Sequence, residues 1–97
     1  MTGKQRAYLR GLANGLDTIF QIGKGGISEE MIRQISAALE ARELIKLRVL
    51  ESAGYTAAEA SRLLAQRTGA QGVATVGSRF VLYRPSQKKP KIELPKA

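Results

Sequence analysis

The stretch TIFQIGKGGISEEMI, residues 18–32, decides the fold. Its first five residues, Thr18–Ile22, are rich in β-branched and aromatic side chains and predict a short β-strand. A glycine-rich segment that carries Lys24 follows. Ser28 then has the side chain typical of a helix N-cap, and the acidic residues directly after it suit the positive end of a helix dipole. A strand, a tight loop and a helix in this order predict the first half of a β-α-β unit.

The flanking sequence continues this alternation. On the N-terminal side, Thr2 and Gln5 form a capping-box pattern that predicts a helix from about Gly3 to Asn14. On the C-terminal side, the expected elements are a helix fading near Arg42, a strand at 44–50, a helix from the Thr56 cap to Thr68, and strands at 72–76 and 79–84. The predicted fold class is therefore α/β, a single domain with the order α-β-α-β-α-β-β and a four-stranded mixed sheet. Strands joined through a helix should be parallel, and the final hairpin antiparallel.

Apolar residues lie on both faces of the expected strands. In the last strand, Phe80 and Leu82 alternate with Val81 and Tyr83. A sheet covered on one face would need only one of these sets. We therefore expect the second and third helices to cover one face and the N-terminal helix to shield part of the other. Lys46 and Arg48, which alternate with apolar neighbours, should lie on the less covered face, near the N-terminal helix.

Composition narrows the function classes. A chain of 97 residues with 43% hydrophobic residues is expected to form one core. It has no cysteine and no histidine, so thiolate metal sites and the commonest general base are absent, and we expect no cofactor and no catalysis. No run of roughly 18 apolar residues or N-terminal secretory segment is present, which predicts a cytoplasmic protein without membrane contact. A monomer is favoured.

Charge is distributed unevenly along the chain. The formal net charge is +8, and the excess lies in residues 1–27 and 70–97, whereas residues 28–69 carry equal numbers of basic and acidic residues. This partition favours a basic patch, which is typical of nucleic-acid binding, over a generally basic surface. Arg6 and Arg10, one helical turn apart, are candidates for that patch.

The segment Gly23-Lys24-Gly25-Gly26 predicts an anion site. Glycine lets a partner approach the backbone closely, and the first N–H groups of the following helix lack intrahelical acceptors. A phosphodiester would satisfy these groups and Lys24 together. KH domains clamp nucleic-acid backbone with two glycines that flank two residues in the same way. The alternative is a tight connection that needs glycine for geometry alone. The spacing fits neither a P-loop nor a dinucleotide fingerprint.

Taken together, several segments resemble the bacterial YhbY family, the stand-alone form of the chloroplast RNA splicing and ribosome maturation (CRM) domain. They are Thr2-Gly3-Lys4-Gln5-Arg6, Leu9-Arg10, Gln21-Ile22-Gly23-Lys24-Gly25-Gly26, Glu43-Leu44-Ile45-Lys46-Leu47 and Val81-Leu82-Tyr83-Arg84-Pro85. The resemblance implies a fold similar to the C-terminal domain of translation initiation factor three. It also implies RNA binding and association with precursors of the large ribosomal subunit, hence with ribosomal RNA.

On the matching positions, the resemblance assigns the RNA-binding loop to Gly23, Lys24, Gly25 and Gly26. It assigns an adjoining basic surface to Lys4, Arg6 and Arg10, with Lys46 as a further contributor. Residues 1–84 would form the RNA-binding domain and residues 85–97 a basic tail rich in proline and lysine. That tail is either flexible or lies along the domain, since Ile92 and Leu94 alternate with charged residues.

Other function classes stay open at this point. The basic surface could dock on an acidic partner protein, which would make the chain a protein-interaction module. A phosphate-ester enzyme using the glycine loop has less support, because no base or metal cluster accompanies the loop. Phosphate contacts alone do not separate RNA from DNA.

Overall fold

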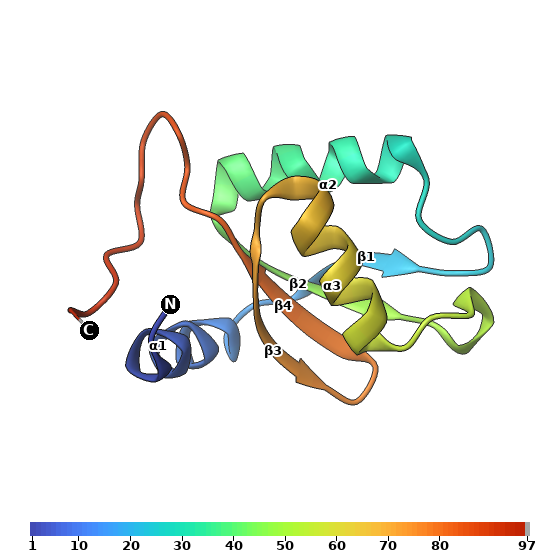
Figure 1. Cartoon of the computed structure of the whole chain (residues 1–97), viewed down its shortest axis with the longest axis horizontal. Coiled ribbons are helices and arrows are strands. Elements are labelled where there is room, and N and C mark those ends of the chain that lie inside the picture. The colour runs from blue at the N-terminus through green and yellow to red at the C-terminus, as the bar shows by residue number, and fades with distance from the viewer. Residues whose placement is uncertain (97) are drawn as a thin grey trace.

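A computed structural model describes residues 1–96, and its elements follow the predicted order (Figure 1). They are α1 (Gly3–Ala13), β1 (Thr18–Ile22), α2 (Glu29–Arg42), β2 (Leu44–Val49), the short 3₁₀ helix η1 (Glu51–Ala53), α3 (Ala57–Thr68), β3 (Gln71–Val76) and β4 (Arg79–Tyr83). The order α-β-α-β-α-β-β is confirmed, and each predicted boundary is met to within about one residue.

The helix boundaries follow from the capping residues. The Thr2 hydroxyl accepts the Gln5 N–H at 3.1 Å while the Gln5 side chain accepts the Thr2 N–H, which completes the capping box of α1. Thr56 and Glu59 form the same reciprocal pair at the start of α3. Gly69, with φ of +76°, takes the left-handed conformation that ends α3.

The four strands form one mixed sheet in the order β1-β2-β4-β3. β1 and β2 are parallel, as a crossover through α2 requires, and β4 lies between β2 and β3, antiparallel to both. Because β1 and β2 run in the same direction, the loops that follow them leave the same end of the sheet, at the right of Figure 1.

Each face of the sheet is covered by different helices. α2 and α3 cover one face, where the core includes Ile35, Leu64 and Phe80, none of them more than 1% exposed. α1 covers part of the other face by packing Leu9 and Ala13 against strand residues that include Val81. The predicted division of the helices between the two faces is confirmed.

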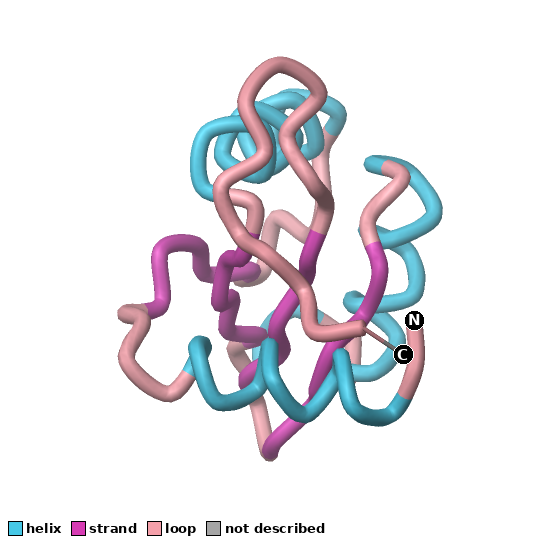
Figure 2. The backbone as a smooth tube through the Cα atoms, turned by 90° about the vertical axis from the view of Figure 1, so that its left-hand side faces the viewer, coloured by secondary structure: helices cyan, strands magenta, loops and turns pink. Residues whose placement is uncertain are grey.

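The C-terminal tail lies along the domain. Glu43, at the end of α2, is 0% exposed, and its carboxylate accepts N–H groups from Ser86 at 2.7 Å, Lys91 at 2.7 Å and Ile92 at 2.8 Å. Further along, the Gln5 side chain donates to the Pro95 carbonyl at 3.0 Å. The described end of the tail thus lies beside the start of α1 (Figure 2). Within residues 1–96, every helix is too short or too polar to cross a membrane.

Candidate nucleic-acid interface

The glycine segment forms a hydrogen-bonded turn between β1 and α2. The Gly26 N–H donates to the Gly23 carbonyl at 2.9 Å, which closes the turn over Lys24 and Gly25. Both residues at the tip are exposed, and their N–H groups have no acceptor among residues 1–96. Two unused backbone donors and a lysine ammonium group are therefore accessible at one place.

The glycines of this turn differ in why they are needed. Gly26 has φ of +71°, in the left-handed region that favours glycine. Gly25 does not have a positive φ, and a Cβ added to it would meet no other group within 4 Å. The backbone conformation therefore favours glycine at position 26, whereas the packing of the chain leaves room for a side chain at position 25. Within residues 1–96, no other group occupies the space beside the Gly25 backbone.

Tyr55 lies against this turn, a contact that no local sequence pattern predicts. It belongs to the loop after β2, and its ring reaches 3.7 Å from the position of a Cβ on Gly26. Tyr55 is 37% exposed. The contact follows from the parallel pairing of β1 and β2, because parallel strands deliver their following loops to the same edge. The turn consequently has an accessible aromatic ring at its side.

The N-terminus of α2 is less suited to bind an anion than a helix start with free N–H groups and no acidic residues. The Ser28 hydroxyl already accepts the Met31 N–H at 3.1 Å, and Glu29 and Glu30 occupy the first turn. Arg67 binds both oxygens of Glu29 at 2.8 Å. A hydrogen bond from Arg33, together with its charge, lowers the pKa of the Glu30 carboxyl, which stays an anion at neutral pH. Acidic side chains therefore stand at the helix start, which leaves the turn amides as the better candidates to donate to a phosphate.

The basic residues of α1 lie on two different sides of that helix. Arg6 and Arg10 are one turn apart and share a side, whereas Lys4 is about 200° around the axis from Arg6. Moreover, α1 and the glycine turn lie toward opposite ends of the long axis of the molecule (Figure 1). The structure therefore places Arg6 and Arg10 at the far end of β1 from the turn and turns Lys4 away from them.

Lys46 lies between these two ends, on the sheet face that α1 partly covers. Together with Arg10 and Arg79 it lines a groove of about 240 Å³, whose other lining residues are Ala13, Asn14, Ala74, Val76 and Val81. No acidic side chain lines this groove. The structure thus brings two of the predicted residues, Arg10 and Lys46, together and adds Arg79 to them.

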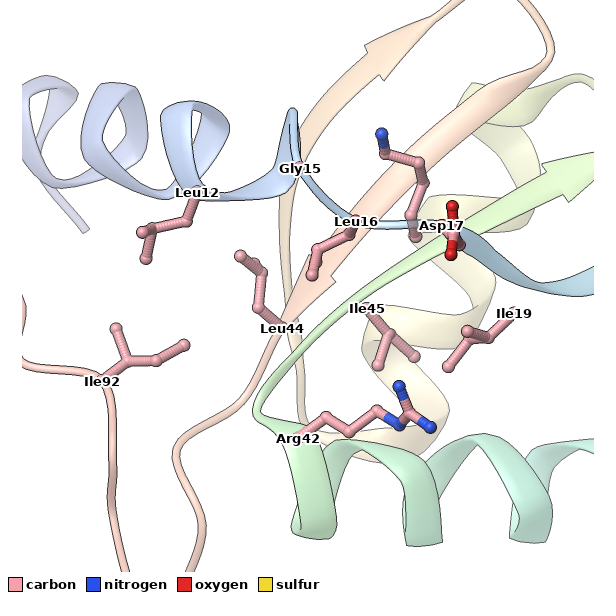
Figure 3. A pocket seen from close by; sticks show the side chains of 10 residues that line it. Leu12, Gly15, Leu16, Asp17, Ile19, Arg42, Leu44, Ile45 and Ile92 are labelled. Atoms are coloured by element: carbon pink, nitrogen blue, oxygen red, sulfur yellow. The ribbon is translucent and has the colours of Figure 1, made fainter.

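A wider groove of about 640 Å³ opens on the other side of Lys46, beneath the link between α1 and β1. Leu12, Leu44 and Ile92 gather at one end, and Asp17 and Arg42 lie at the other (Figure 3). Its lining mixes apolar residues with both signs of charge, so it lacks the uniform basic character of the smaller groove. Within residues 1–96, no three acidic side chains form a group that could hold a metal ion.

Known proteins similar to this chain include RNA-binding proteins. The family model described as the CRS1 / YhbY (CRM) domain matches residues 1–84. The chain is 45% identical over 95 residues to YqeI of Bacillus subtilis, named a probable RNA-binding protein, with 98% of this chain and 99% of that protein covered. It is 35% identical over 96 residues to a Haemophilus influenzae protein named RNA-binding protein, with 99% and 96% covered.

The fold comparison agrees. The solution structure of a Staphylococcus aureus protein, described as a candidate RNA-binding protein, superposes with a TM-score of 0.81 at 49% identity and covers 98% of this chain and 99% of that one. The α/β fold class is confirmed, and so is the resemblance found in the sequence motifs. The chain belongs to the CRS1 / YhbY (CRM) domain family.

Proposed function

We propose that this chain is a monomeric, cytoplasmic RNA-binding protein that acts by binding and not by catalysis, and that it associates with precursors of the large ribosomal subunit. Membership of the CRM family and the names of the relatives support RNA as the partner. The resemblance to the YhbY family supports the ribosomal context.

The glycine turn holds a phosphate of the RNA backbone in this proposal. The N–H groups of Lys24 and Gly25 donate to phosphate oxygens, and the Lys24 ammonium neutralises their charge. The observation that carries the proposal is Gly25, whose bare backbone neither its φ nor its packing requires. Gly23 and Gly26 complete the turn, and Gly26 supplies its left-handed residue.

The remaining basic residues extend the contact away from the turn. Arg10 and Lys46 share one groove, and Arg6 lies one turn further along the same side of α1. These residues bind the RNA strand after it has crossed the sheet. Lys4 is on another side of α1 and contributes through its charge.

Two substitutions at the turn test the proposal. Lys24→Ala and Gly25→Asp should each weaken RNA binding about tenfold or more, because they remove a cation or place a carboxylate where the phosphate lies. Arg62→Ala, which removes one positive charge from an exposed position on α3, is the matched control. Fluorescence anisotropy with a labelled ribosomal RNA fragment measures the affinity, and thermal unfolding checks the fold. Wild-type affinity in both turn variants would refute the role of the turn.

The ribosomal context needs a separate test. A tagged protein should sediment with large-subunit precursors in a sucrose gradient, and nuclease treatment should release it. Association that survives nuclease would favour the alternative, in which the basic surface docks on an acidic protein. Competition between RNA and DNA of the same sequence at fixed salt then separates the two nucleic acids.

A further inference from the structure

Two arginines face each other across neighbouring strands on the open side of the sheet. Arg48 of β2 and Arg79 of β4 are directly opposed in the antiparallel register. Directly opposed residues share a sheet face, and like charges in that position destabilise the fold. Neither arginine forms an ion pair among residues 1–96, and the buried Nε of Arg48 has no hydrogen-bond acceptor there. The free protein keeps an unfavourable arrangement that a bound anion would relieve.

The pair lies on the part of the face that α1 leaves uncovered. α1 packs over the Leu44–Tyr83 end of the β2–β4 register, whereas Arg48 pairs on its other side with Gln21, close to the glycine turn. Lys46, two residues before Arg48 on the same face, leads into the groove that Arg10 and Arg79 also line. Positive side chains therefore run continuously from the turn end of the sheet to α1.

We propose that this row, consisting of Arg10, Lys46, Arg48 and Arg79, is a second RNA subsite that binds an unpaired nucleotide. The inference rests on the proposed RNA-binding function and adds the class of RNA. A phosphate lies between Arg48 and Arg79, where its single negative charge reduces the repulsion between the two guanidinium groups and its oxygens accept their hydrogen bonds. The adjoining base enters the groove, where it can stack on a guanidinium plane.

The shape and lining of the groove specify an unpaired nucleotide. The groove encloses about 240 Å³, and between its cations lie Ala13, Ala74, Val81 and Val76, the last 75% exposed. A single base can cover these apolar groups, whereas the bases of a duplex are stacked inside the helix and cannot reach them. Duplex RNA would contact the rim cations through its phosphates and leave the apolar groups in water.

This role differs from a structural one in its effect on stability. If the pair stabilised the fold, removing one member would lower the melting temperature. If the pair is maintained for binding, the same removal relieves like-charge repulsion and leaves the free protein equally or more stable while its RNA affinity falls.

The test compares Arg79→Gln and Arg48→Gln with Arg62→Gln, which removes the same charge from the exposed surface of α3. Fluorescence anisotropy measures binding of a labelled single-stranded RNA and of the same strand annealed to its full complement. Each sheet variant should bind single-stranded RNA about tenfold more weakly and lose less affinity for the duplex. In each variant, the slope of log affinity against log salt concentration should fall in magnitude by about 0.7. Thermal unfolding without RNA should show no loss of stability in Arg79→Gln.

Several outcomes would overturn the inference. Single-strand affinities of both sheet variants within twofold of Arg62→Gln would remove the subsite, and equal losses on single-stranded and duplex RNA would remove the unpaired nucleotide. The proposed function fails on different results. It fails if the wild type binds neither single-stranded nor duplex RNA, or if the Lys24 and Gly25 variants bind RNA as the wild type does.

Discussion

Replacing Glu43 by glutamine isolates the contact that holds the tail. The wild-type carboxylate is fully buried and accepts three N–H groups from Ser86, Lys91 and Ile92. Glutamine keeps one oxygen, which can still serve Lys91 and Ile92, but its NH₂ group must face the Ser86 donor. One charge-assisted hydrogen bond is lost and two donors oppose each other, so we expect a loss of about 2–3 kcal/mol in the free energy of unfolding.

The size of the loss has an upper limit. If the tail leaves the domain, water solvates its N–H groups, so the variant loses no more than the free energy of tail docking. That free energy includes the burial of Ile92 and Leu94 against the apolar cluster that contains Leu9 and Ala13 of α1. For a domain of this size, a loss of about 2–3 kcal/mol lowers the melting temperature by roughly 10–20 °C.

The effect should depend on pH in a defined direction. Burial alone would raise the pKa of the Glu43 carboxyl, but N–H groups from Ser86, Ile92 and Lys91 and the charge of Lys91 favour the anion and leave the pKa below its ordinary value. A lowered folded-state pKa means that this stabilisation is complete above the unfolded value, about 4.3, and is lost as pH falls through the folded value. Glu43→Gln should therefore differ most from wild type at neutral pH, and the difference should shrink below about pH 4.

Urea unfolding followed by circular dichroism at several pH values measures this difference, and amide hydrogen exchange at Lys91 and Ile92 reports release of the tail. Glu93→Gln is the control, because it makes the same chemical change at an exposed tail position. A Glu43→Gln loss below about 0.5 kcal/mol at neutral pH, or a loss that stays constant down to pH 3, would refute the reasoning.

Two further predictions concern the fold. Gly26→Ala should lower the free energy of unfolding by about 1–2 kcal/mol, because φ at this position is +71°, while Gly25→Ala should change it by less than about 0.5 kcal/mol. Chemical denaturation of the two variants measures the difference, and equal losses would contradict the prediction. Arg84→Lys should lower the free energy of unfolding by about 1.5–3 kcal/mol. The guanidinium donates to the Ser36 hydroxyl and carbonyl and to the Thr68 carbonyl, and one ammonium group cannot reach all three acceptors. Thermal unfolding measures the loss, and an unchanged melting temperature would contradict the prediction.

Local sequence signals predicted most of the fold. The capping pairs at Thr2 and Thr56 join residues three positions apart, so the sequence alone predicted where these helices begin. The two-sided apolar pattern of Phe80 and Val81 likewise predicted which faces needed covering. Such signals are strong where the physics is local.

The features that the sequence did not predict depend on long-range register. Glu43 ends a helix in a charged segment, where an exposed carboxylate is the ordinary expectation, and its burial depends on a tail more than forty residues away. The Arg48–Arg79 opposition depends on the β2–β4 register, and the Tyr55 contact on two loops meeting at one edge. For the same reason, the sequence did not predict that Arg10 and the glycine turn lie at opposite ends of the molecule.

The way in which Glu43 holds the tail also bears on how this protein can change in evolution. Its carboxylate binds backbone N–H groups, so the side chains at positions 86, 91 and 92 do not determine that contact, provided that none becomes proline. The three prolines of the tail, Pro85, Pro90 and Pro95, all avoid these positions. The Glu43 contact therefore survives changes of side chain at these positions, whereas the packing of Ile92 and Leu94 still favours apolar residues there, so low conservation elsewhere in the tail would not indicate disorder.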